Sequence, residues 1–147
     1  MLALKLTAAL ATLALTAGVA LAQGAKPTDP QIAHIAYTAG NIDIAAAQQA
    51  LKKSKNKDVR AFAQDMVRDH KAVNQKALAL VKKLKVTPED NPTSQALKKQ
   101  ADATLADLGK KNGADFDRGY IQNEAAYHQT VNGARAAEYA DSVGAEP

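Results

Sequence analysis

The sequence contains no cysteine and no tryptophan, and aromatic residues make up only 4% of its 147 residues. The absence of cysteine excludes a disulfide scaffold, a thiolate metal site, an iron–sulfur cluster and a catalytic thiol. Any metal ion must therefore be bound by histidine, aspartate, glutamate or tyrosine. The histidines of the chain are His34, His70 and His128.

Neither positive nor negative charge dominates the chain. Nineteen basic residues are interspersed with 15 acidic ones, which gives a formal net charge of +4. A nucleic-acid-binding protein usually carries a basic stripe, so no nucleic-acid partner is expected. Hydrophobic residues at 46%, charged residues at 23% and only five prolines are typical of a globular protein. The length suits one domain.

The first 22 residues have the features of a cleaved secretory signal peptide. Lys5 supplies a positive charge, residues 6–19 form an apolar run, and Ala20-Leu21-Ala22 precedes Gln23 as a small-x-small cleavage site. The run is short for a transmembrane helix and rich in alanine and threonine. We therefore expect cleavage after Ala22, a mature form without a transmembrane span, and a periplasmic location.

The remaining chain shows helical periodicity, and no segment alternates like a strand. We predict a polar tether over residues 23–29, a helical domain over residues 30–140 and a flexible tail over residues 141–147. The first helix is expected to start at Asp29, the second at residues 56–58, a shorter third at Ser94 and the last at Asp115. The short connections favour an all-α, antiparallel helical bundle.

Four polar residues are predicted to converge in the interior of this bundle, because they share or border apolar helix faces: Asp43, His70, Glu124 and His128. One interpretation is a divalent-metal site, since bundles hold metals with inward-facing glutamate and histidine. The other is a buried polar network without any cofactor, which the absence of a Glu-x-x-His pair favours. His34 lies off its apolar stripe, so we expect it at the surface.

No arrangement typical of a catalytic centre is found. The serines do not lie in a Gly-x-Ser-x-Gly motif, and no glycine-rich loop follows a strand. No catalytic residue is therefore predicted, and the sequence leaves open whether the protein is an enzyme.

Three segments together resemble the bacterial domain of unknown function 4142 family: residues 39–43 (AGNID), residues 56–70 (NKDVRAFAQDMVRDH) with Asn74, and residues 116–121 (FDRGYI) with His128-Gln129. The resemblance covers about residues 30–131. It implies an exported, ferritin-like helical bundle, often labelled an outer membrane protein and linked to envelope or stress biology. The family has no established reaction.

The resemblance also implies a further long helix with another histidine, for which this sequence has no matching segment. A missing helix would leave the core partly open along Ile42, Val67, Val73 and Val131, and a homodimer would cover it. Three hypotheses remain: a structural or stress-related envelope protein without enzymatic activity, a metal-binding (iron or zinc) or oxidase-type protein, and a protein-interaction module.

Overall fold

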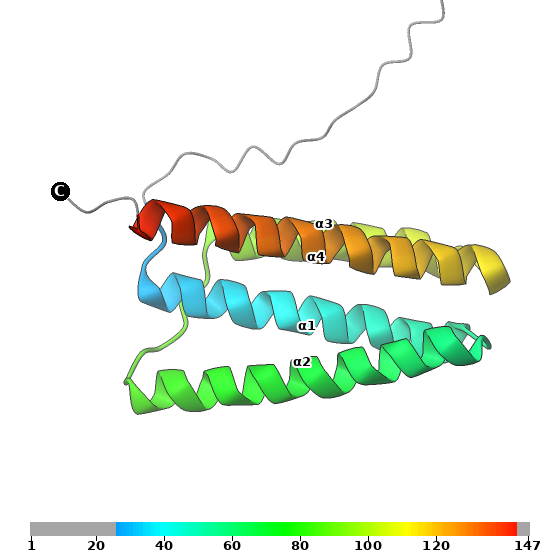
Figure 1. Cartoon of the computed structure of the whole chain (residues 1–147), viewed down its shortest axis with the longest axis horizontal. Coiled ribbons are helices and arrows are strands. Elements are labelled where there is room, and N and C mark those ends of the chain that lie inside the picture. Colours follow the sequence, from blue (N-terminus) through cyan, green and yellow to red (C-terminus); the bar gives the residue numbers. More distant parts are fainter. Residues whose placement is uncertain (1–25, 144–147) are drawn as a thin grey trace, which may run out of the picture.

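The computed structural model describes the backbone of residues 26–143 and the side chains of residues 26–133. The predicted leader, the first three residues of the predicted tether and the last four residues lie outside this range. Four helices follow one another up and down (Figure 1): α1 (Asp29–Lys53), α2 (Lys57–Lys83), α3 (Pro92–Gly109) and α4 (Gly113–Val143). The predicted all-α bundle is confirmed. Within the described residues, no helix has the length and apolar character needed to cross a membrane.

The helices begin where short polar side chains satisfy free backbone N–H groups. Asn56 Oδ1 accepts hydrogen bonds from the N–H groups of Asp58 (2.9 Å) and Val59 (3.3 Å) at the start of α2. Two predicted caps were wrong by one to three residues. Thr28, not Asp29, caps α1, and Asn91, not Ser94, caps α3. Helix α4 begins at Gly113, whose φ of 53° favours glycine, rather than at Asp115.

Helices α1 and α2 form the closest pair of the bundle, because small residues line their contact. Ala46, Ala47 and Ala50 of α1 and Ala63 of α2 are 0–2% exposed, and small side chains let helix axes approach. Further along, Asn74 of α2 is buried against α1. Its Nδ2 donates to Asn41 Oδ1 at 3.0 Å, so this pair fixes the register of the two helices.

Gly40→Ala should destabilise the protein by about 1–3 kcal/mol, because a Cβ at this position would overlap the Asn74 side chain. Gly133→Ala provides the matched control, since none of the described side chains lies within 4 Å of its Cβ position. Alanine should there be neutral or stabilising by up to about 1 kcal/mol. Urea denaturation of both variants measures the difference, and equal midpoints would show that α1 and α2 are further apart than described.

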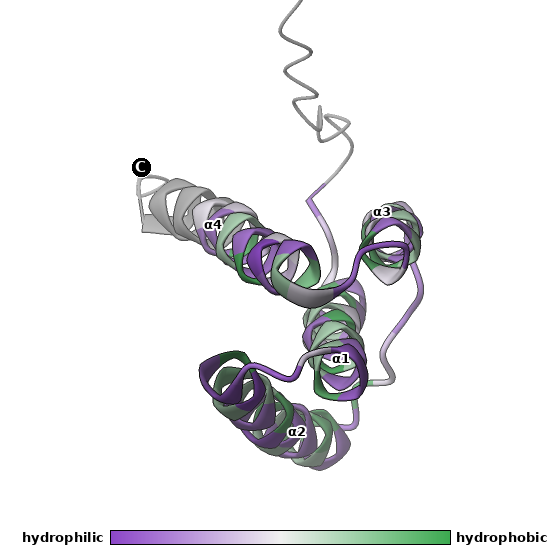
Figure 2. Cartoon of the chain, turned by 90° about the vertical axis from the view of Figure 1, so that its right-hand side faces the viewer, coloured by the Kyte–Doolittle hydropathy of each residue, from purple (hydrophilic) through white to green (hydrophobic). Residues whose placement is uncertain are grey.

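Helix α1 occupies the centre of the molecule. It contacts each of the other three helices, and α3 also contacts α4. The end-on view in Figure 2 shows α1 between α2 on one side and the pair α3 and α4 on the other. Helices α2 and α4 run in the same direction (Figure 1).

The tightest part of the core lies where α2 and α4 begin. Phe116 and Tyr120 of α4 are fully buried, and the ring of Tyr120 lies 6.0 Å from that of Phe62. Leu108 of α3 completes this cluster. The predicted interior face of α2 is only partly covered, because Val73 is 60% exposed and Leu84 is 61% exposed. Val73 therefore lies uncovered on the stripe along which the sequence predicts a partly open core, and the homodimer remains a prediction.

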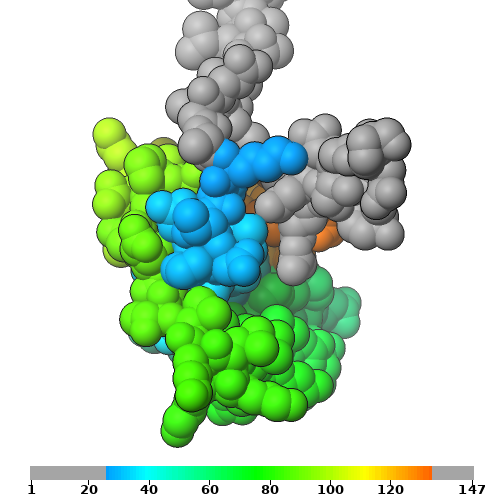
Figure 3. Space-filling view, turned by 90° about the vertical axis from the view of Figure 1, so that its left-hand side faces the viewer, coloured from blue at the N-terminus to red at the C-terminus, as the bar shows by residue number. Residues whose placement is uncertain are grey.

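The connection between α2 and α3 returns to the start of α1 (Figure 3). There the Glu89 N–H donates to the Pro30 carbonyl at 3.0 Å. His34 Nδ1 lies 2.9 Å from Ser94 Oγ, and the His34 side chain is 28% exposed. The prediction of a plain surface position for His34 was therefore wrong. The cause is a loop that covers His34, and the periodicity of one helix does not reveal it.

Candidate metal centre

Three helices bring one carboxylate and two imidazoles together halfway along the bundle. Asp43 projects from α1, His70 from α2 and His128 from α4. His70 Nδ1 lies 3.3 Å from Asp43 Oδ2, and His128 Nε2 lies 3.7 Å from Asp43 Oδ1. The two imidazole centroids are 5.6 Å apart. One ligand atom from each residue lies within 4.8 Å of the other two.

The burial of these groups differs. Asp43 is 3% exposed, whereas the His70 and His128 side chains are 21% and 37% exposed. Burial raises the pKa of Asp43 to about 7, because a carboxylate loses its hydration there. Burial also lowers the pKa of His70, and the nearby His128 adds to this effect. Both shifts favour neutral side chains when no ion compensates the buried charge.

Glu124 lies beside this group, one turn before His128 on α4. It is 2% exposed, and burial raises its pKa to about 8, with a further contribution from the charge of Asp43. It does not belong to the three residues whose ligand atoms lie within 4.8 Å of one another. Glu124 is therefore a buried neighbour of the cluster, and it is not one of the three grouped residues.

Two buried carboxyl oxygens in this region have no hydrogen-bond partner within the described residues: Asp43 Oδ1 and Glu124 Oε2. A buried acceptor without a donor typically costs about 1–3 kcal/mol, so natural proteins rarely leave one unmatched. The polar-network interpretation requires such partners. A bound cation instead satisfies a buried carboxylate oxygen directly.

Two tyrosines of α4 also lie near the cluster. They were not predicted from the sequence as site residues. Burial raises the pKa of both Tyr120 and Tyr127, and the charges of Asp43 and Glu124 add to this. The Tyr127 hydroxyl donates to the Ala39 carbonyl at 3.3 Å, which ties α4 to α1. The spacing of four residues between Tyr120 and Glu124 was the available signal, because it places both on one helix face.

The structure thus places all four predicted polar residues in one region, with Asp43, His70 and His128 in mutual reach and Glu124 adjacent. The arrangement is that of a helical-bundle protein with an interior carboxylate–imidazole cluster. A family model described as "Domain of unknown function (DUF4142)" matches residues 7–146, and the chain belongs to this family. This confirms the resemblance found in the sequence. No curated protein and no solved structure matches the chain.

Proposed function

We propose that this protein binds one divalent transition-metal ion through Asp43, His70 and His128. The observation that carries the proposal is the meeting of two imidazole nitrogens with a buried carboxylate that has an unpartnered oxygen. Two histidines and one carboxylate form a recurrent ligand set for zinc and for non-haem iron(II). Side chains on facing bundle helices commonly build such sites.

The distances support a shared ion. Zinc binds imidazole nitrogen and carboxylate oxygen at about 2.0–2.2 Å, so two ligand atoms on one tetrahedral ion lie roughly 3.4 Å apart. His70 Nδ1 lies 3.3 Å from Asp43 Oδ2 and His128 Nε2 lies 3.7 Å from Asp43 Oδ1, so each imidazole nitrogen is close to this distance from one carboxylate oxygen. One ligand atom of each residue also lies within 4.8 Å of the other two, which supports a single shared ion.

We extend the proposal to the location of the protein. The basic start, apolar run and small-x-small sequence before Gln23 support export to a bacterial periplasm. The family resemblance implies a link to the cell envelope or to stress. A periplasmic bundle that binds a metal ion but catalyses no reaction is compatible with that link. The observations do not require a reaction at the bound ion.

Metal titration of the purified, chelator-treated protein tests the proposal. Zinc measured by calorimetry, and cobalt(II) measured by its visible absorption, should each bind at one ion per chain. His70→Ala and His128→Ala should each weaken zinc binding at least about 100-fold, because each removes one of the three ligands.

His34→Ala is the matched control, since this histidine lies at the start of α1 and contacts Ser94 instead of the cluster. It should bind zinc like the unchanged protein. Equal zinc affinity in all three histidine variants, or no binding by the unchanged protein, would contradict the proposal.

A further inference from the structure

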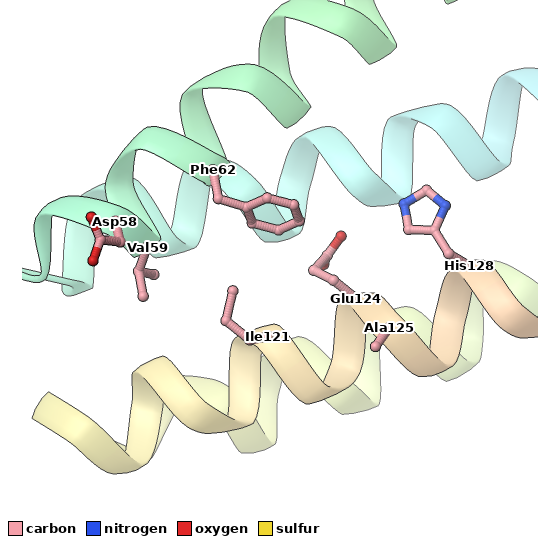
Figure 4. A pocket seen from close by; sticks show the side chains of 7 residues that line it. All are labelled: Asp58, Val59, Phe62, Ile121, Glu124, Ala125 and His128. Carbon is pink, nitrogen blue, oxygen red and sulfur yellow. The ribbon is translucent and has the colours of Figure 1, made fainter.

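An open pocket of about 460 Å³ lies between the first halves of α2 and α4. Figure 4 shows Val59 and Phe62 of α2 facing Ile121 of α4 across this space. Asp58 lies at one end of the pocket, and Glu124 and His128 lie toward the other. The volume falls in the range of about 300–1,000 Å³ that small-molecule sites occupy.

One wall of this pocket carries a buried acceptor without a donor. Glu124 is 2% exposed, lines the pocket, and its Oε2 has no hydrogen-bond partner among the described residues. Its other oxygen, Oε1, lies 3.5 Å from Asn123 Nδ2. Because Glu124 lies outside the group proposed to hold the metal, the proposed ion does not take up this oxygen.

The other polar features of the pocket select for positive charge. Among the described residues, its lining includes the acidic residues Asp58 and Glu124 and the imidazole of His128, but no lysine or arginine. Phe62 lines the pocket and is 38% exposed, and an aromatic face attracts a cation. Val59 and Ile121 offer apolar surface between the two carboxylates. The lining is complementary to an apolar body with a cationic end.

We propose that this pocket binds a small aliphatic amine, whose ammonium group donates to Glu124 and whose chain lies between Val59, Phe62 and Ile121. A second ammonium group at the far end of the chain would meet Asp58. A diamine therefore matches the pocket better than a monoamine. The site is distinct from the proposed metal site, although His128 borders both.

Titration of the metal-free protein with hexylamine, hexanoate and 1,6-diaminohexane tests this proposal. Aliphatic ammonium groups resemble that of lysine, so they stay charged at about pH 8.5. Hexylamine should bind at least about tenfold more tightly than hexanoate, and the diamine more tightly than hexylamine. Calorimetry gives the affinities. Resonance shifts of the Phe62 and Ile121 amides locate the ligand. Preferential binding of hexanoate would overturn the proposal without any variant.

Two substitutions separate the ends of the pocket. Glu124→Gln keeps the shape of the side chain and should weaken both amines at least about tenfold, because it removes a charge-assisted hydrogen bond. Asp58→Asn should remove only the advantage of the diamine over hexylamine. Asp102→Asn, on the exposed face of α3, should change neither. Unchanged amine affinity in Glu124→Gln would overturn the proposal.

A zinc titration of the amine-bound protein distinguishes this site from the metal site. If both assignments hold, zinc and hexylamine bind together. If zinc displaces hexylamine, Glu124 is a metal ligand, and the amine site is wrong while metal binding stands. If hexylamine binds to a protein that takes up no zinc, metal binding fails and the amine site stands.

Discussion

The metal-free protein should be more stable near pH 5 than near pH 9, by about 2–4 kcal/mol. The pKa of Asp43 is raised from 3.8 to about 7 in the folded protein, and that of Glu124 from 4.5 to about 8. Both folded-state pKa values lie above the unfolded ones. The resulting stability is therefore fully present below about pH 4 and is lost as the pH rises through 7 and 8.

Other groups oppose this trend only at the acidic end. The pKa of His70 is lowered, so its contribution to stability is lost as the pH falls. The pKa values of Asp69, Asp90 and Asp107 are also lowered, each mainly by a side-chain hydrogen bond at the surface. Their contributions are lost in strong acid, below the range compared here. The comparison between pH 5 and pH 9 therefore reports the two buried carboxyl groups, less the opposing contribution of His70 below about pH 6.5.

Asp43→Asn identifies the group responsible. The amide has the same shape but does not ionise, so the variant should lose part of the pH dependence and exceed the unchanged protein in stability near pH 9. Asp102→Asn changes an exposed carboxylate paired with Lys98 and should leave the pH profile parallel to that of the unchanged protein. Urea denaturation with a chelator present, repeated across the pH range, measures all three. A stability that rises toward pH 9 would be the opposite result.

Phe116→Ala should lower the free energy of unfolding by about 3–5 kcal/mol, the range expected for emptying a fully buried aromatic site. Phe116 has no exposed surface, its ring stacks on Tyr120 with centroids 6.4 Å apart, and Lys53 Nζ lies 5.6 Å from its centroid. Its removal leaves a cavity between α4 and the end of α1. Urea denaturation at a single pH measures the loss.

Phe62→Ala is the matched control for this prediction. The same atoms are deleted, but Phe62 is 38% exposed, and its ring lies beside that of Tyr120 at the edge of the core. Water fills the space that its ring leaves, so we expect a loss of only about 1–2 kcal/mol. If the two variants unfold at the same urea concentration, Phe116 is less enclosed than the structure describes.

Most of the fold could be predicted from the sequence, because each helix carries its own local signals. Periodicity located all four helices, and the lysines near residue 53 and residue 83 marked the ends of α1 and α2. The first residue of each helix was harder to predict. Asn91, Pro92 and Ser94 all favour a helix start, and only the bond from the Ser94 N–H to Asn91 Oδ1 decides between them. The extent to which Val73 is covered could not be read from α2 alone, because it depends on whether another helix packs on that face.

The candidate site could be predicted as a set of residues but not as a geometry. Helical phase alone places His70 and Asp43 on inward faces. It does not show that Asp43 reaches both imidazoles while Glu124 lies outside their group, because that depends on how α1, α2 and α4 are rotated relative to one another. The pocket beside Glu124 was also beyond sequence reasoning. It depends on the spacing of α2 and α4, which are not neighbours along the chain.

The central position of α1 limits how the sequence of this bundle diverges. Ala47 and Ala50 have no exposed surface, and the cluster around them draws side chains from all four helices. A larger residue there must be matched by simultaneous changes on several helices, because a packed core does not absorb extra volume locally. The exposed positions of α2, such as Val73 and Leu84, can be replaced one at a time. Relatives of this chain should therefore keep small residues in α1 long after the outer face of α2 has changed.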